Sequence, residues 1–149
     1  MGLRMMFTNS NKIGSFLIRW VTWSDYSHTA LLIDDTRIAH ADFSGVHVED
    51  IQSLKDRSKK WMIVEYEYDH VDGVIQACLE QVGKPYDYSG IVGILLRNVD
   101  LQDDSKWWCS EYPAGGCKKA GKPMFQDEYM SRITPQHWLM LPHTVLDKS

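Results

Sequence analysis

One of the three cysteines in the chain, Cys109, follows two tryptophans and precedes Ser110-Glu111 in the segment KWWCSEYP. A helix that begins near Cys109 or Ser110 would place Pro113 in its first turn, where a missing N–H has no intrahelical partner. The exposed N–H groups and the positive dipole end of such a helix stabilise a thiolate. The pattern therefore predicts a nucleophilic cysteine, and the alternative is a cysteine buried for packing alone.

A helix terminus contributes only about 1 kcal/mol to such a thiolate, whereas lowering a cysteine pKa from about 8.5 to about 4 takes roughly 6 kcal/mol. A histidine must supply the difference, and His28 and His40 flank the turn-forming residues 34–36. A three-residue loop there would pair Ile33 with Arg37 and place both imidazoles on one face of a hairpin. A two-residue loop would place them on opposite faces. The turn lacks Asn-Gly or Asp-Gly, which favours three residues.

The remaining histidines and cysteines carry weaker signals. His47 alternates with two valines and is expected to face solvent, and the other three histidines lie at a helix start or in the tail: His70, His137 and His143. Cys78 and Cys117 are expected to be inert residues of helices. An odd number of cysteines without a C-x-x-C pair favours neither a disulfide framework nor a zinc site. No metal and no cofactor are expected.

The elements that must position these residues follow from hydrophobic periodicity. Strands are expected over 27–33, 37–41, 46–48 and 61–68, the last being rich in β-branched and aromatic residues. Helices are expected over 13–22, 71–82, 89–97 and 108–120. Strands before helices indicate an α+β fold, with a small antiparallel sheet packed against helices. At 149 residues the chain fits a single domain, 1–149.

Charge and composition narrow the class of partner. The formal charge is -4 with 24% charged residues, and no basic block stands out, so a nucleic-acid partner is not expected. No apolar run approaches the roughly 18 residues of a membrane span, and no signal-peptide or myristoylation pattern is present. The sequence therefore indicates a protein that is cytoplasmic as synthesised, without a transmembrane segment.

Four segments in order resemble a known family. Ser27-His28 followed by Ile38–Ala41 and Gly45-Val46, then Gly83–Asp87 (GKPYD) and Cys109-Ser110-Glu111, are similar to motifs of the circularly permuted NlpC-type papain-like hydrolases. This branch includes the YiiX-like proteins and is related to the lecithin:retinol acyltransferase group. Thr134-Pro135 also lies where a T-P often precedes the last turn. The resemblance spans roughly residues 14–141, and the histidine preceding the cysteine marks the permutation.

The resemblance implies a role for each matched residue. Cys109 would be the nucleophile, His28 the general base and His40 the third, orienting residue. YiiX-like members commonly have Glu at that third position, so His40 departs from them and is like the His of many unpermuted NlpC-type peptidases. Four further residues are candidates for contact with substrate: Tyr26, Tyr86, Trp108 and Glu111. Core or rim packing is the favoured alternative for the two tyrosines, and a favourable acid in the first helical turn is the alternative for Glu111.

Three functions remain open at this stage. The leading hypothesis is a cysteine hydrolase that cleaves an amide bond, in a peptide or cell-wall peptide, through an acyl-enzyme at Cys109. A lipid-directed acyl hydrolase or acyltransferase would use the same thiol chemistry. A catalytically silent binding domain of the same fold would leave Cys109 an ordinary thiol. The sequence does not fix the substrate or the oligomeric state.

Overall fold

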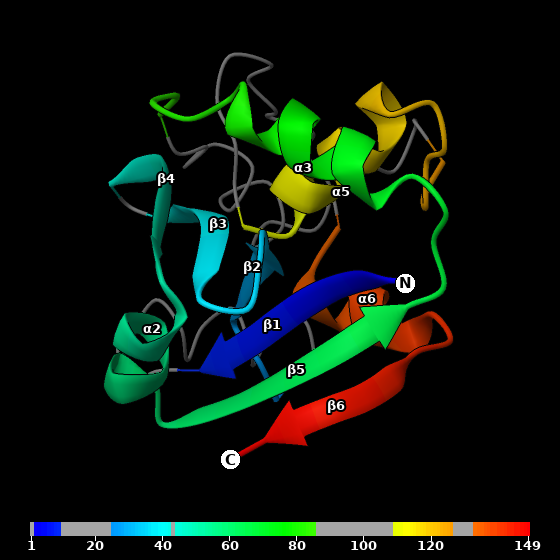
Figure 1. The fold of residues 1–149 in the computed structure, drawn as a ribbon. Coiled ribbons are helices and arrows are strands. Elements are labelled where there is room, and N and C mark those ends of the chain that lie inside the picture. The colour runs from blue at the N-terminus through cyan, green and yellow to red at the C-terminus, as the bar shows by residue number, and fades with distance from the viewer. Residues whose placement is uncertain (1, 10–24, 43, 86–108, 127–132) are drawn as a thin grey trace, which may run out of the picture.

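The computed structural model describes residues 2–9, 25–42, 44–85, 109–126 and 133–149. In this part of the chain six strands form one antiparallel sheet in the order β4-β3-β2-β1-β5-β6 (Figure 1). The strands are β1 (Leu3–Asn9), β2 (His28–Leu32), β3 (Arg37–Asp42), β4 (Gly45–Asp50), β5 (Lys60–Tyr66) and β6 (Thr144–Lys148). The described helices are α2 (Ile51–Arg57), α3 (Val71–Leu79), α5 (Glu111–Lys119) and α6 (Pro135–Met140). The expected α+β class is confirmed.

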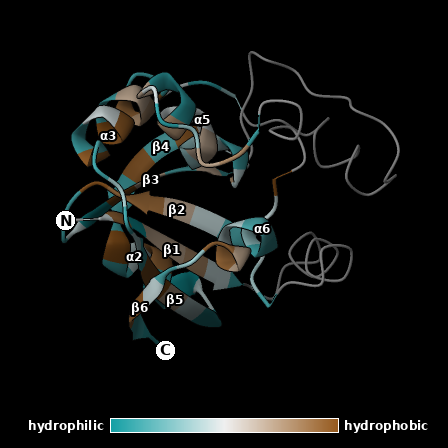
Figure 2. Cartoon of the chain, turned by 90° about the vertical axis from the view of Figure 1, so that its right-hand side faces the viewer, coloured by the Kyte–Doolittle hydropathy of each residue, from teal (hydrophilic) through white to brown (hydrophobic). Residues whose placement is uncertain are grey.

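The sheet is buried on both faces by two separate sets of apolar side chains. The larger set joins alternate residues of the central strands, such as Met5 and Leu31, to Val74 of α3 and Trp138 of α6. The smaller set lies on the opposite face under Leu54 of α2. Figure 2 shows brown apolar residues concentrated in the strands between these helices. Burial of both faces explains why β1 is almost continuously buried, since successive apolar side chains enter one set and then the other.

The hairpin between β2 and β3 has the three-residue loop that places both histidines on one face. Leu31 pairs with Ala39, and the Ile33 N–H donates to the Arg37 carbonyl at 3.0 Å. Asp34 holds the loop because its Oδ1 accepts hydrogen bonds from the backbone N–H groups of Thr36, at 2.9 Å, and Arg37, at 2.8 Å. An acceptor of this kind at the start of a turn substitutes for a backbone turn bond. The predicted register is confirmed.

Helix α5 is held in its middle by α3 and at its start by Trp138. Gly116 packs so closely on α3 that a Cβ there would lie 2.5 Å from Cys78 Sγ. At the start of α5 the Trp138 Nε1–H donates to the Ser110 carbonyl at 2.9 Å. Pro113 lies in the first turn, as expected, and Gly121 just beyond the helix has φ of +85°, which favours glycine.

The order of elements differs from the expected sequence of strands followed by helices. Helix α2 separates β4 from β5, and β6 is the last element. Helix α2 carries only two apolar residues, Ile51 and Leu54, and all five residues of β6 are exposed, so neither has a clear periodic pattern. The helix predicted over 71–82 ends at Leu79. The helices predicted over 13–22 and 89–97 lie outside the described residues.

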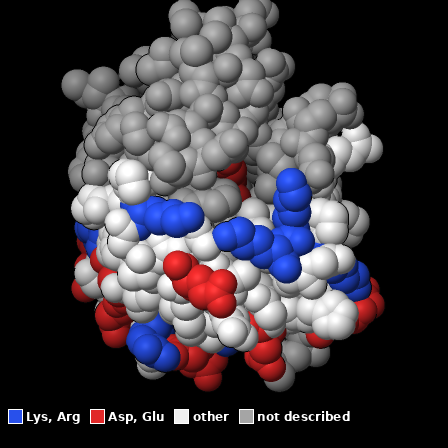
Figure 3. Space-filling view, turned by 90° about the horizontal axis from the view of Figure 1, so that it is seen from above, with Lys and Arg blue, Asp and Glu red and all other residues white. Residues whose placement is uncertain are grey.

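The surface agrees with the balanced charge of the sequence. Figure 3 views the molecule from above, over α3 and α5, and shows Lys and Arg interspersed with Asp and Glu on the described part of this face. None of the described helices is long and apolar enough to cross a membrane.

Candidate functional site

Cys109 lies just before α5, beside the backbone of β2. Its sulfur is 3.8 Å from the Ser27 carbonyl oxygen, and the neighbouring Ser110 hydroxyl is 3.2 Å from Thr29 Oγ1. Ser27 and Thr29 are the residues on either side of His28. The described β2–β3 ladder extends no further than Leu31–Ala39, and the sulfur lies beside Ser27, just before the start of β2.

The thiol is protonated in this environment. Burial raises the pKa of Cys109 to about 11, although the Ser110 hydroxyl and nearby backbone N–H groups lower it in part. Only 1% of Cys109 is exposed. Among the described residues its hydrogen-bond partners are the Ser27 carbonyl and the Ser110 hydroxyl, at 3.8 Å each, and no imidazole nitrogen is one of them. The sequence led us to expect a stabilised thiolate, but here the cost of burying a charge is larger than the effect of the helix terminus.

His28 and His40 meet directly across the hairpin. His28 Nε2 lies 2.6 Å from His40 Nδ1, and the ring centroids are 4.9 Å apart. One nitrogen must donate and the other accept, so each ring fixes the tautomer of the other. Burial and the neighbouring His40 lower the pKa of His28 to about 3. His28 therefore rests as a neutral imidazole.

The carboxylate of Glu49 contacts the ring nitrogen of His40 that does not face His28. His40 is fully buried, and its Nε2 lies 3.1 Å from Glu49 Oε1 on the neighbouring strand. The direction of this contact is not that of a hydrogen bond, so His40 Nε2 has no hydrogen-bond partner among the described residues. Arg57 of α2 holds the same carboxylate by pairing with both oxygens. Burial raises the pKa of Glu49, but its contacts with His40 and Arg57 outweigh burial and bring the pKa to about 2.

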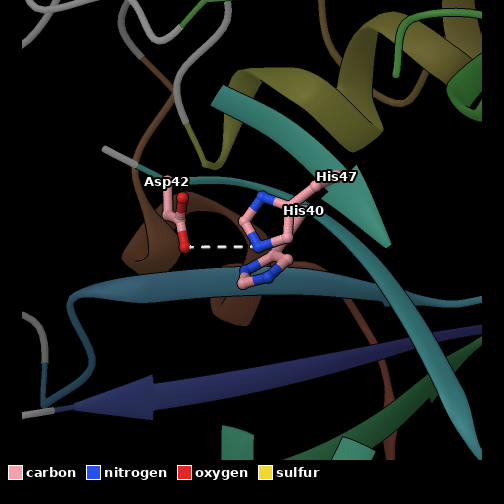
Figure 4. Close-up of side chains that lie close together, drawn as sticks. All are labelled: His40, Asp42 and His47. Carbon is pink, nitrogen blue, oxygen red and sulfur yellow. Dashed lines mark ion pairs between the residues drawn. The ribbon is translucent and has the colours of Figure 1, made fainter. Parts of the chain in front are cut away.

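His47, which the sequence predicted to face solvent, is half-buried, with 31% of its side chain exposed. It pairs with His40 across the β3–β4 ladder, and the two ring centroids are 4.5 Å apart. Its Nε2 is 3.6 Å from Asp42 Oδ2, and Figure 4 shows these three side chains converging. The strand expected over 46–48 extends from Gly45 to Asp50 as β4, and the imidazole of His47 packs against that of His40 on the same face of the sheet. His40, Asp42 and His47 each offer a ligand atom within 4.8 Å of the others.

The four residues expected to contact substrate have different outcomes. Tyr26 is buried in the core with its ring edge-on to Phe7, at 6.2 Å between centroids. Glu111 is the first residue of α5 and is also buried. Tyr86 and Trp108 lie outside the described residues.

Sequence reasoning missed Glu49, Asp42 and His47 as members of this site. A two-residue connection between β3 and β4 would have predicted the register of these strands, in which Asp42 pairs with Gly45. That register places His47 opposite His40 and Glu49 opposite Ile38. The hairpin signal was weak because Phe43-Ser44 is not one of the usual turn pairs.

Comparison with known proteins supports the fold alone. No protein-family model matches the chain, and no curated protein matches it in sequence. Among solved structures it is similar to a crystal structure described as metalloprotein YiiX from Escherichia coli O157:H7, DUF1105. The TM-score is 0.73 at 17% sequence identity, and the alignment covers 100% of this chain and 97% of that one.

Proposed function

We propose that this protein is a cysteine hydrolase of the permuted NlpC-type, papain-like kind, which cleaves an amide bond through an acyl-enzyme at Cys109. The observation that carries the proposal is the His28–His40 contact of 2.6 Å, together with a Cys109 sulfur that lies 3.8 Å from the backbone carbonyl of Ser27, the residue before His28. The YiiX-like fold agrees with it. His28 and His40 are twelve residues apart in the sequence, so their contact is a product of the fold.

The contacts suggest one consistent set of proton positions. Glu49 faces His40 Nε2, so that nitrogen carries the proton and His40 Nδ1 accepts from His28 Nε2–H. His28 Nδ1 is then the basic nitrogen. In the proposed reaction it takes the Cys109 proton while the sulfur bonds to the substrate carbonyl carbon. It returns that proton to the leaving amine, and a water deprotonated by the same nitrogen then hydrolyses the thioester.

Glu49 supplies what a neutral third histidine lacks. A histidine stabilises an imidazolium less than a carboxylate does, yet here a carboxylate of pKa about 2 lies 3.1 Å beyond it. The negative charge acts through His40 on the positive charge that develops on His28. We therefore assign Glu49 as a positioning residue, and Glu49→Gln should lower kcat by about 10-fold or more while KM changes little.

The resting site is neutral, which distinguishes it from a preformed thiolate–imidazolium pair. Burial raises the pKa of Cys109 and lowers that of His28. Proton transfer between them is therefore unfavourable until substrate supplies an electrophile and the backbone N–H of Cys109 binds the developing oxyanion. General-base catalysis with a neutral thiol is the mechanism that fits these pKa values.

An acyl-trapping experiment tests the proposal. We would incubate the protein with p-nitrophenyl acetate, follow release of p-nitrophenolate, and locate the acetyl group by mass spectrometry. Cleavage after Lys106 and Lys118 yields one peptide with both Cys109 and Cys117, so fragment ions must assign the site. We expect acetylation of Cys109, abolished in Cys109→Ala and slowed by at least about 100-fold in His28→Ala.

Two controls separate the alternatives. Cys117→Ala removes a buried thiol far along α5 and should leave acetylation unchanged. Equal acetylation of the wild-type protein and His28→Ala would instead indicate the catalytically silent domain. Release of fatty acid from phosphatidylcholine vesicles, without cleavage of peptide p-nitroanilides, would favour the lipid-directed acyl hydrolase or acyltransferase over the amide hydrolase.

A further inference from the structure

We propose that His40, Asp42 and His47 form a binding site for a divalent transition-metal ion, best suited to Zn²⁺. Their ligand atoms lie within 4.8 Å of one another at the end of the β3–β4 hairpin (Figure 4). Two imidazoles with one carboxylate favour zinc and similar ions over the hard cations Mg²⁺ and Ca²⁺, which prefer oxygen ligands. This site does not depend on the proposed hydrolase reaction.

The backbone register brings the three residues together. His40 and Asp42 are two positions apart on β3, so their side chains project from the same face. His47 is the cross-strand partner of His40 on β4. The short connection between the strands therefore converts the sequence pattern H-x-D-x4-H into three ligands on one face.

Neighbouring groups hold two of the ligands in an orientation suited to a metal. His47 Nδ1 lies 3.1 Å from the Gly45 carbonyl, so this nitrogen donates and Nε2 keeps a lone pair. Asp42 Oδ1 accepts from the Ser44 N–H, at 2.9 Å, and from its hydroxyl, at 2.6 Å. Asp42 Oδ2 then points to His47 Nε2. Metal-binding histidines commonly donate their second nitrogen to a carbonyl in this way.

His40 supplies the independent sign that a ligand belongs here. It is fully buried, and its Nε2 makes an ion-pair contact of 3.1 Å with Glu49 Oε1 but has no hydrogen-bond partner among the described residues. A buried polar nitrogen without a partner is costly, and binding to a metal ion removes that cost. The other nitrogen, Nδ1, faces His28 at 2.6 Å. Coordination through Nε2 requires that this nitrogen lose the proton assigned to it in the proposed reaction, and coordination through Nδ1 requires that His28 give up its contact. Metal binding therefore opposes the proposed thiol chemistry.

Direct binding measurements test the site without any assay of activity. The protein would be stripped with EDTA, dialysed, and titrated with Zn²⁺ by calorimetry and with Co²⁺ by visible absorption. We expect one ion per chain. His47→Gln and Asp42→Asn should each weaken binding by at least about 100-fold. Asp42→Asn keeps an oxygen that can accept from Ser44, so it tests the ligand if His47→Gln fails to fold.

The controls assign the ion to these residues. His70→Gln removes an exposed histidine at the start of α3 and should bind Zn²⁺ as the wild-type protein does. Cys109→Ala, which cannot form an acyl-enzyme, should also bind normally. No zinc binding by the wild-type protein, or unchanged binding in both His47→Gln and Asp42→Asn, would overturn the proposal. Loss of binding in Cys109→Ala would also overturn it, because the ion would then lie at the thiol.

Discussion

Replacing Cys109 with alanine should make the fold less sensitive to alkali. Burial raises the pKa of this thiol from 9.0 to about 11. As the pH rises, the unfolded chain releases its proton first and the folded protein only later. The contribution of the protonated thiol to stability is therefore complete below pH 9, and it is lost as the pH rises from there to about 11.

The expected magnitude follows from the same two values. At pH 10 the unfolded thiol lies one unit above its pKa of 9.0, while the folded thiol is still mostly protonated. The free energy of unfolding should therefore fall by about 1.4 kcal/mol between pH 7 and pH 10 because of this one group. Alanine has no such group, so Cys109→Ala should lack this part of the loss.

Urea unfolding followed by tryptophan fluorescence, at pH 7 and pH 10 with a reductant present, measures the difference. The variant should be less stable at pH 7 because it leaves a cavity, but its loss on going to pH 10 should be smaller than in the wild-type protein by about 1.4 kcal/mol. Cys78→Ala and Cys117→Ala are matched controls, since burial raises both pKa values to about 12. They should show a similar difference.

Equal losses in the wild-type protein and Cys109→Ala, with the controls behaving as expected, would refute this reasoning. Such a result would mean that the pKa of Cys109 is the same in the folded and the unfolded protein, so that burial does not hold the thiol protonated. A smaller loss in the wild-type protein than in Cys109→Ala would instead mean that the folded thiol is already ionised at pH 7, and the general-base mechanism with a neutral thiol would have to be abandoned.

Two further predictions concern packing and the hairpin loop. Gly116→Ala should destabilise the fold by about 1–3 kcal/mol in urea unfolding, because the added Cβ would lie 2.5 Å from Cys78 Sγ. Gly73→Ala on α3 is the matched change that meets Ala120 Cβ at an ordinary 3.5 Å, and it should stabilise by about 0.5–1 kcal/mol. Destabilisation by both would show that α3 and α5 pack differently. Asp34→Ala should lower the melting temperature because Thr36 and Arg37 lose their acceptor, whereas Asp34→Asn, which keeps an oxygen, should lower it less; equal effects would contradict the assigned role.

The parts of the site set by local rules were predictable from the sequence. No favoured two-residue turn pair occurs between Ile33 and Arg37, which supported the prediction of a three-residue loop. The structure has that loop, and it places His28 and His40 on one face of the sheet. Pro113 limited where α5 starts. In both cases a single backbone constraint decided the outcome.

The parts set by tertiary contacts were not predictable. Strand β1 has no alternating pattern because it lies in the middle of a sheet that is covered on both faces. Nothing in the local sequence indicates that the carboxylate of Glu49 contacts both Arg57 and His40. The burial that raises the pKa of Cys109 likewise depends on how α5 docks against β2.

The indole of Trp138 reaches across to the carbonyl of Ser110, the residue that follows the thiol. This bond ties the carboxyl-terminal helix to the start of α5, so the nucleophile cannot be presented correctly until nearly all of the chain has been made. A shortened protein that ends before α6 should therefore be without thiol chemistry even if its sheet assembles. Work on the isolated histidine hairpin or on amino-terminal fragments would consequently report nothing about the reaction.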